Sequence, residues 1–253
     1  MSSEAPSADP SLRHAFERAR DADAGDAELA FHRARLADEG PTLVAMCGIG
    51  RLLVPLAAGG ATVHGADASA AAIAVAQARL AERHCDALLV RQALDELNLA
   101  FRYRAAFLPD GALNRIVAPT RALEGLRRVA AHLVAPAALV LDLAVPAEAR
   151  HAPGAPLVEM RTATAADGTR VGWRSETRVD VEGRRIDRID RFEKREGRAI
   201  VARHDERVAL TWYERDEIAS MLEIAGFANV EIETAPWIAD GDAERWVAIA
   251  TLA

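Results

Sequence analysis

The chain has 253 residues, of which 51% are hydrophobic, so it is long enough for one large core that carries a smaller sub-domain. Its net charge of −7 excludes the strongly basic surface on which nucleic-acid binding depends. No apolar run approaches the roughly 18–20 residues of a membrane span, and the polar start is unlike a signal peptide. With two cysteines that lack metal-ligand spacing, we expect a cytoplasmic protein without a structural metal.

A run of small and polar residues, 1–10, opens the chain, and we expect it to be a disordered leader. Apolar residues then recur at helical spacing over residues 11–38, with an interruption around Gly25, which predicts two short helices. Between residues 42 and 143, short apolar runs alternate with helical segments. This alternation predicts a parallel sheet that is buried by helices on both faces.

The pattern changes at Pro146. Residues 156–212 hold four stretches rich in β-forming side chains, separated by acidic residue–glycine pairs that are typical of hairpin turns. These stretches predict an antiparallel β meander, after which a helix and two strands return to the earlier pattern. The expected domains are therefore a leader (1–10), a Rossmann-like α/β domain (11–145 and 212–253) and an inserted β sub-domain (146–211).

Two motifs at the ends of neighbouring predicted strands carry the chemistry. The first strand leads into Cys47-Gly48-Ile49-Gly50, where the glycines let the backbone approach a ligand closely and the next helix presents its amide groups. The second strand ends at Asp67, a position where dinucleotide-binding folds hold the ribose hydroxyls with an acidic residue. Asp67 could also cap the next helix together with Ser69, and the two roles are compatible.

This order of motifs resembles the class I S-adenosylmethionine-dependent methyltransferases. Residues 47–53 are similar to the glycine turn of that family, and residues 225–227, Ala-Gly-Phe, are similar to the helix end that precedes its last hairpin. The resemblance covers about residues 40–145 and 212–253. It implies an α/β fold, a Rossmann-like seven-stranded methyltransferase sheet, with the inserted antiparallel β meander packed over the carboxyl ends of its strands as a lid.

The resemblance also implies S-adenosylmethionine as the cofactor and direct displacement at its methyl group as the reaction. In that reaction most of the rate comes from proximity and alignment, so a neutral amine acceptor needs no general base, and we assign no catalytic residue. The cofactor-binding residues that the resemblance implies are Met46, Cys47, Gly48, Gly50, Asp67, Ala68, Ala93, Leu94 and Leu108.

Four further residues are candidates for binding the acceptor substrate. Asp110 and Asn114 lie in the loop after the predicted fourth strand, where such sheets open their ligand crevice, although an ordinary Asp-Gly turn also explains them. His204 in the meander could act as a base, or it could lie on the surface of a hairpin. Trp173 could form a wall of the acceptor pocket, or it could simply belong to the core.

Three positions depart from the family pattern. The acidic residue of the first strand falls on Val44, the first glycine falls on the bulky Met46, and the acidic residue near the adenine falls on Ala93. Each lost carboxylate removes a hydrogen-bond acceptor worth ~1.5–3 kcal/mol, so two such losses weaken cofactor binding ~100-fold or more.

Two functions are therefore favoured over a third, an unrelated nucleotide-binding oxidoreductase, which the methyltransferase-like tail and the short glycine turn disfavour. The first is S-adenosylmethionine-dependent methyl transfer to a nitrogen, oxygen or carbon nucleophile of a small molecule. The alternative is a methyltransferase-like protein with a degenerate cofactor site, which acts as a partner subunit or catalyses a reaction other than methylation. The exposed edges of the meander predict a homodimer. The basic residues are all arginine except Lys194, which is typical of bacterial coding bias.

Overall fold

The computed structural model describes residues 7–21, 23–37, 39–145, 156–165, 167–197, 199–237 and 244–252. The chain divides into two compact units, each built from two separate stretches of sequence. The α/β unit holds the described residues from 23 to 145 and from 211 to 252, and the β unit holds those from 7 to 21 and from 156 to 210.

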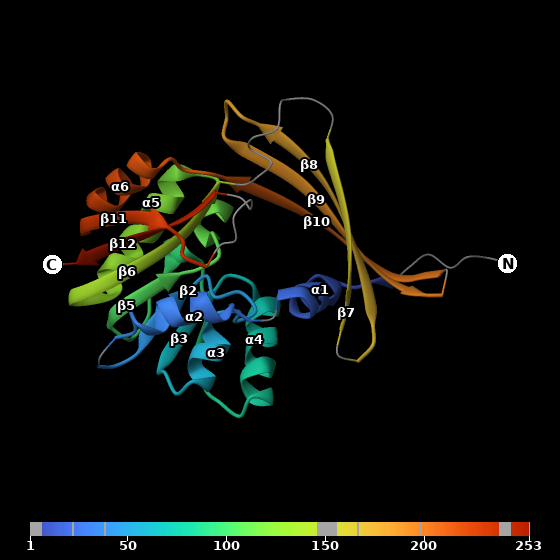
Figure 1. Ribbon diagram of the computed structural model, residues 1–253, viewed down its shortest axis with the longest axis horizontal. Coiled ribbons are helices and arrows are strands. Elements are labelled where there is room, and N and C mark those ends of the chain that lie inside the picture. The colour runs from blue at the N-terminus through green and yellow to red at the C-terminus, as the bar shows by residue number, and fades with distance from the viewer. Residues whose placement is uncertain are drawn as a thin grey trace. The chain divides into compact units, whose positions relative to one another are not determined.

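The α/β unit is built on one seven-stranded sheet (Figure 1). Its strands are β2 (Thr42–Ala45), β3 (Val63–Asp67), β4 (Leu88–Arg91), β5 (Tyr103–Leu108), β6 (Leu133–Val145), β11 (Ala228–Thr234) and β12 (Glu244–Leu252). They lie in the order β11-β12-β6-β5-β2-β3-β4. The strands from β6 to β4 run parallel, while β12 is antiparallel to β6 and to β11. The predicted seven-stranded, mostly parallel sheet is confirmed.

Helices cover both faces of this sheet. One face carries α5 (Pro119–His132) and α6 (Arg215–Ile224), and the other carries α2 (Asp26–Arg33), α3 (Leu53–Ala58) and α4 (Ala70–Glu82). Two short 3-10 helices, η1 (Leu94–Glu96) and η2 (Ala112–Arg115), follow β4 and β5.

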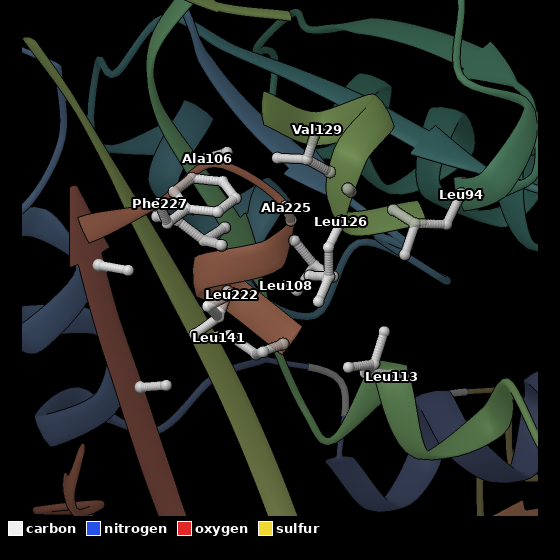
Figure 2. Packing of buried hydrophobic residues seen from close by; sticks show 14 of the residues in the cluster. Leu94, Ala106, Leu108, Leu113, Leu126, Val129, Leu141, Leu222, Ala225 and Phe227 are labelled. Carbon is white, nitrogen blue, oxygen red and sulfur yellow. The ribbon is translucent and has the colours of Figure 1, made fainter. Parts of the chain in front are cut away.

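The two faces hold separate apolar clusters. On the α5–α6 face, Leu126, Leu222 and Phe227 pack in one cluster with Leu108 and Leu141 of the sheet (Figure 2). On the face of α2, α3 and α4, a second cluster buries the side chains of alternate strand positions. Burial on both faces explains why these strands are continuous apolar runs in the sequence.

The β unit is a mainly antiparallel sheet with one helix on it (Figure 1). The predicted four-stranded meander is present, as β7 (Leu157–Thr164), β8 (Arg170–Asp180), β9 (Arg185–Glu196) and β10 (Ala199–Thr211). The sheet order is β1-β10-β9-β8-β7, in which β1 (Ser7–Ala8) pairs with β10 in parallel. Helix α1 (Ser11–Asp21) packs Leu12 and Phe16 against Val171, Phe192 and Ala202 of the sheet.

Two expectations about the start of the chain need correction. Residues 7 and 8 form a strand, so the predicted leader at 1–10 is ordered over its described part, and residues 1–6 lie outside the described residues. Helix α1 belongs to the β unit, although the sequence placed residues 11–21 in the α/β domain. Helical periodicity reveals that a helix has an apolar face, but it does not reveal which sheet that face covers. None of the helices in the described ranges is long and apolar enough to cross a bilayer.

A glycine in β3 allows α3 and β4 to pack closely around this strand. A Cβ on Gly65 would lie 2.6 Å from Leu53 Cδ1, 2.7 Å from Leu89 Cδ2 and 2.9 Å from Cys47 Sγ. We therefore expect Gly65→Ala to lower the free energy of unfolding by about 1–3 kcal/mol, measured by urea denaturation. Gly172→Ala in β8 is the control, because a Cβ there would meet only the Glu193 carbonyl oxygen, at an ordinary contact distance of 3.8 Å. An equal loss in both variants would contradict this explanation.

Candidate functional site

The turn after β2 has three residues in the left-handed region. Met46, Gly48 and Gly50 have φ angles of 54°, 55° and 81°. A Cβ on Gly50 would lie 2.7 Å from Val54 Cγ2 and 3.3 Å from Ala76, so this position needs glycine for both conformation and space. A Cβ on Gly48 would meet nothing within 4 Å, so the space beside this backbone is open to a ligand.

Met46 keeps the backbone conformation that a glycine would adopt in this turn. A left-handed backbone costs a residue with a side chain roughly 1–2 kcal/mol. The Met46 side chain packs against the apolar cluster on the α5–α6 face, and this burial offsets part of that cost. Position 46 is therefore left-handed although it carries a side chain.

Asp67 ties the end of β3 to this turn. The Gly48 amide donates to Asp67 Oδ2 at 2.8 Å, and the Ser69 amide donates to Oδ1 at 2.8 Å. Ser69 is the N-cap of α4, since its hydroxyl accepts from the Ala72 amide at 3.2 Å. A carboxylate oxygen can accept more than one hydrogen bond, so Asp67 is still able to accept from the hydroxyls of a ribose.

The other residues implied as cofactor contacts lie at or near the carboxyl ends of four parallel strands, β2, β3, β4 and β5. Cys47, Leu94 and Leu108 are buried, whereas Ala68 is exposed. Burial raises the pKa of the Cys47 thiol well above its usual range, so this cysteine is not a thiolate nucleophile. Ala93 is the N-cap of η1 and has no side-chain acceptor to offer.

The loop after β5 is fixed by polar contacts to its neighbours. Asp110 and Gly111 are both left-handed, each with φ of 60°. Asn114 is buried, and its amide group donates to the carbonyl oxygens of Ala144 at 2.9 Å and Thr211 at 2.7 Å. Both Asn114 amide hydrogens are thus in use within the fold, while the Asp110 side chain is 52% exposed.

Charged side chains connect this loop to the glycine turn. Arg51, directly after Gly50, makes a two-pronged ion pair with Glu28 of α2, at 2.8 and 2.5 Å. Its guanidinium also lies 3.8 Å from the Asp110 carboxylate, which Arg245 of β12 approaches to 3.5 Å. The Glu28–Arg51 pair is largely buried, with side-chain exposures of 5% and 19%.

Two buried ionisable groups lie on the same face of the sheet as this ion pair. Asp142 of β6 is fully buried, and burial raises the pKa of its carboxyl to about 7. Burial lowers the pKa of His32 to about 4, so its ring is neutral at pH 7. His32 Nδ1 lies 2.9 Å from the Glu28 carbonyl oxygen, which only accepts hydrogen bonds, so Nδ1 carries the proton.

Within the β unit, Trp173 and His204 are both engaged in packing. Trp173 Nε1 donates to Asp190 Oδ1 at 3.0 Å, and its ring packs against Phe16 with centroids 5.8 Å apart. The His204 ring stacks on Phe192, with centroids 6.3 Å apart. Roles for these two residues in acceptor binding stay predictions.

The sequence brought Gly48, Gly50 and Asp67 together correctly, but it missed the buried charges. Glu28, Arg51 and Asp142 are far apart in the chain, and only Asp142 left a signal, as an acidic residue inside an apolar strand. The described ranges contain no group of three or more histidine, cysteine or acidic residues that could hold a metal ion.

Comparison with known proteins agrees with this geometry. Residues 43–134 match the family model described as a methyltransferase domain. No curated protein matches the chain in sequence.

Solved methyltransferases share the fold of the chain at low sequence identity. An S-adenosylmethionine-dependent methyltransferase from Clostridium acetobutylicum has a TM-score of 0.75 at 16% identity, covering 95% of this chain and 97% of its own. An amino pentose methyltransferase from Micromonospora echinaspora, solved with S-adenosylmethionine, has a TM-score of 0.68 at 21% identity, covering 94% and 92%. A sugar N-methyltransferase from Streptoalloteichus has a TM-score of 0.71 at 18% identity, covering 98% and 95%.

The class of protein follows from the domain match and the fold together. Residues 43–134 match the model of a methyltransferase domain, and the fold around them is shared with solved S-adenosylmethionine-dependent methyltransferases. The predicted resemblance is thereby confirmed. The family match and these structures support S-adenosylmethionine as the cofactor.

The Glu28–Arg51 pair generates a test of the site's framework. Glu28→Gln removes the two-pronged partner of the largely buried Arg51 guanidinium and leaves only the more distant Asp110 carboxylate, at 3.8 Å. We therefore expect the free energy of unfolding to fall by about 2–4 kcal/mol in urea denaturation. Glu124→Gln is the matched control, because Glu124 pairs with Arg128 on an exposed helix surface and should change stability by less than about 1 kcal/mol. Similar losses in both variants would show that the buried pair contributes no more than a surface pair.

Proposed function

We propose that this protein transfers a methyl group from S-adenosylmethionine to an amine nitrogen of a small molecule. The observation that carries the proposal is the left-handed turn from Met46 to Gly50, with open space beside Gly48 and Asp67 bonded to the Gly48 amide. A backbone of this shape presents amide groups to a polar ligand, and the carboxylate next to it can hold a ribose.

An amine acceptor is supported by the chemistry of the site and by the named structures. The fold is shared with an amino pentose methyltransferase and a sugar N-methyltransferase. A neutral amine attacks without a general base, which suits a site in which Cys47 is a protonated thiol and His32 is buried. The exposed carboxylate of Asp110 is placed to accept a hydrogen bond from the amine or a nearby hydroxyl.

The cofactor, when bound, supplies a methyl group that is activated by a positively charged sulfur. With the cofactor bound, an acceptor amine would take up the methyl group, the neutral thioether would be the leaving group, and the proton of the product ammonium would pass to solvent. The chain's own contribution is to bind and align: the glycine turn and Asp67 hold the nucleoside, and the loop of Asp110 orients the acceptor. Most of the rate then comes from proximity. We further propose that the β unit excludes water as a lid.

The alternative, a degenerate scaffold, rests on Val44 and Ala93. Val44 is fully buried in the apolar cluster of its face, so this position packs the core where the family pattern has a carboxylate. Calorimetric titration with S-adenosylhomocysteine separates the two functions. Binding in the low micromolar range supports the enzyme, and no binding at millimolar ligand supports the scaffold.

Asp67 is expected to be the main polar contact to the ribose. We predict that Asp67→Ala weakens binding of S-adenosylhomocysteine ~10–150-fold, because the hydroxyls lose their acceptor. The Gly48 and Ser69 amides lose theirs too, so the melting temperature should also fall. Asp86→Asn, at an exposed position before β4, controls for the lost charge.

A ligand that lacks the 2′-hydroxyl distinguishes a direct hydrogen bond between Asp67 and the ribose from an indirect effect of Asp67 on the shape of the glycine turn. In the parent, 2′-deoxy-S-adenosylhomocysteine should bind more weakly than S-adenosylhomocysteine. In the Asp67 variant the two ligands should bind alike. A difference that is the same in both proteins would show that Asp67 does not contact that hydroxyl.

We also propose that the protein is a homodimer that pairs through the β unit. Strand β7 is an edge of its sheet, and it exposes Val158 by 52% and Met160 by 74%. Such an edge needs cover. Light scattering should give a dimer mass that falls toward the monomer in Val158→Lys/Met160→Lys. A monomer mass for the parent across a concentration series would refute the proposal.

A further inference from the structure

Two side chains fasten the loop after β5 to the neighbouring strand β6. Asp142 Oδ2 accepts from the Asp110 amide at 2.8 Å, at the point where the chain enters the left-handed turn. Asn114 attaches the other end of the loop to β6. Its side-chain amide group donates to the Ala144 carbonyl oxygen, and its Oδ1 accepts from the Ala144 amide. The backbone position of Asp110 is therefore set from β6.

Asp142 lies among charges from several elements. Arg245 of β12 favours its ionised form, whereas Asp110 of the loop and Glu28 of α2 disfavour it. Arg51, directly after the glycine turn, interacts electrostatically with the Asp142 carboxylate, and its guanidinium lies 3.8 Å from the Asp110 carboxylate. The same group of charges thus reaches both the glycine turn and the loop.

A fully buried carboxyl is a costly way to accept one amide hydrogen bond. Asp142 is 0% exposed, and within the described parts of the chain its Oδ1 atom has no hydrogen-bond partner. A neutral asparagine could also accept a hydrogen bond from the Asp110 amide, and it would not need to bury a charge. An ionisable group at this strand position therefore points to a role beyond stability.

We propose that Asp142 is a positioning residue for methyl transfer, whose ionised carboxylate fixes the Asp110 loop beside the glycine turn. The inference rests on the proposed function, because it assigns the loop to the acceptor. The bond from the Asp110 amide to a carboxylate is charge-assisted and is about twice as strong as a bond to a neutral carboxyl. Protonation of Asp142 therefore loosens the loop without breaking the fold.

The pH dependence has a definite sign. Burial raises the pKa of Asp142 to about 7, so the carboxylate predominates above pH 7 and the neutral acid below it. The loop is consequently held more firmly as the pH rises through 7. The same raised pKa makes the folded state relatively less stable as the pH rises from about 4 to 7, because the buried carboxyl resists ionisation there.

The hold on the loop can be observed without any substrate. In nuclear magnetic resonance spectra between pH 5.5 and 8.5, the Asp110 amide of the parent should titrate with a midpoint near 7. In Asp142→Asn, which keeps the shape and an acceptor oxygen, that titration should vanish. It should persist in Glu124→Gln, where a distant surface carboxylate is removed. An Asp110 amide that does not shift in the parent, or shifts equally in Asp142→Asn, overturns the inference.

Kinetics then test the positioning role with an amino sugar that the parent methylates. At pH 8, kcat of Asp142→Asn should be about tenfold below the parent, and the two should converge at pH 6. Affinity for S-adenosylhomocysteine should stay within about twofold. Protonation of the acceptor amine affects both proteins alike and cancels in the ratio. A kcat ratio that is the same at both pH values overturns the role. A parent that methylates no amine contradicts the proposed function instead, and the amide titration still decides whether Asp142 holds the loop.

Discussion

The hydrogen bond from the Gly48 amide to the Asp67 carboxylate joins the ends of two neighbouring parallel strands, and the glycine turn depends on it. A chain that passes through three left-handed residues needs a fixed point to keep that path. Asp67 supplies it, and its second oxygen orders the Ser69 amide where α4 begins. One carboxylate thereby shapes both the turn and the start of a helix.

The buried charges link elements that the sheet alone would leave independent. Taking Glu28 and Arg51 out of water costs much of what their attraction returns, so the net stability gained from such a pair is small. Its effect is geometric, because Arg51 is held between α2 and the carboxylate of Asp110. Asp142 adds a second attachment for the same loop, from the strand beside it.

The departures from the family pattern have unequal physical consequences. Met46 is left-handed and packs its side chain against the core. Val44 and Ala93 have no side-chain acceptor: Val44 packs in the core, and Ala93 is the N-cap of η1. These two positions therefore lower the hydrogen-bonding capacity of the site, which is why affinity for the cofactor is the informative quantity.

The sequence by itself determined the alternation of strands and helices, the meander and the pairing of the glycine turn with Asp67. These features are local, because apolar periodicity, turn residues and strand ends each depend on a few neighbouring positions in the sequence. Only the tertiary structure decided that α1 packs on the sheet of the β unit, because the apolar face of a helix does not determine which sheet it covers. The same holds for Glu28, Arg51 and Asp142, whose proximity depends on long-range packing, and burial in that packing is what shifts the pKa of Asp142.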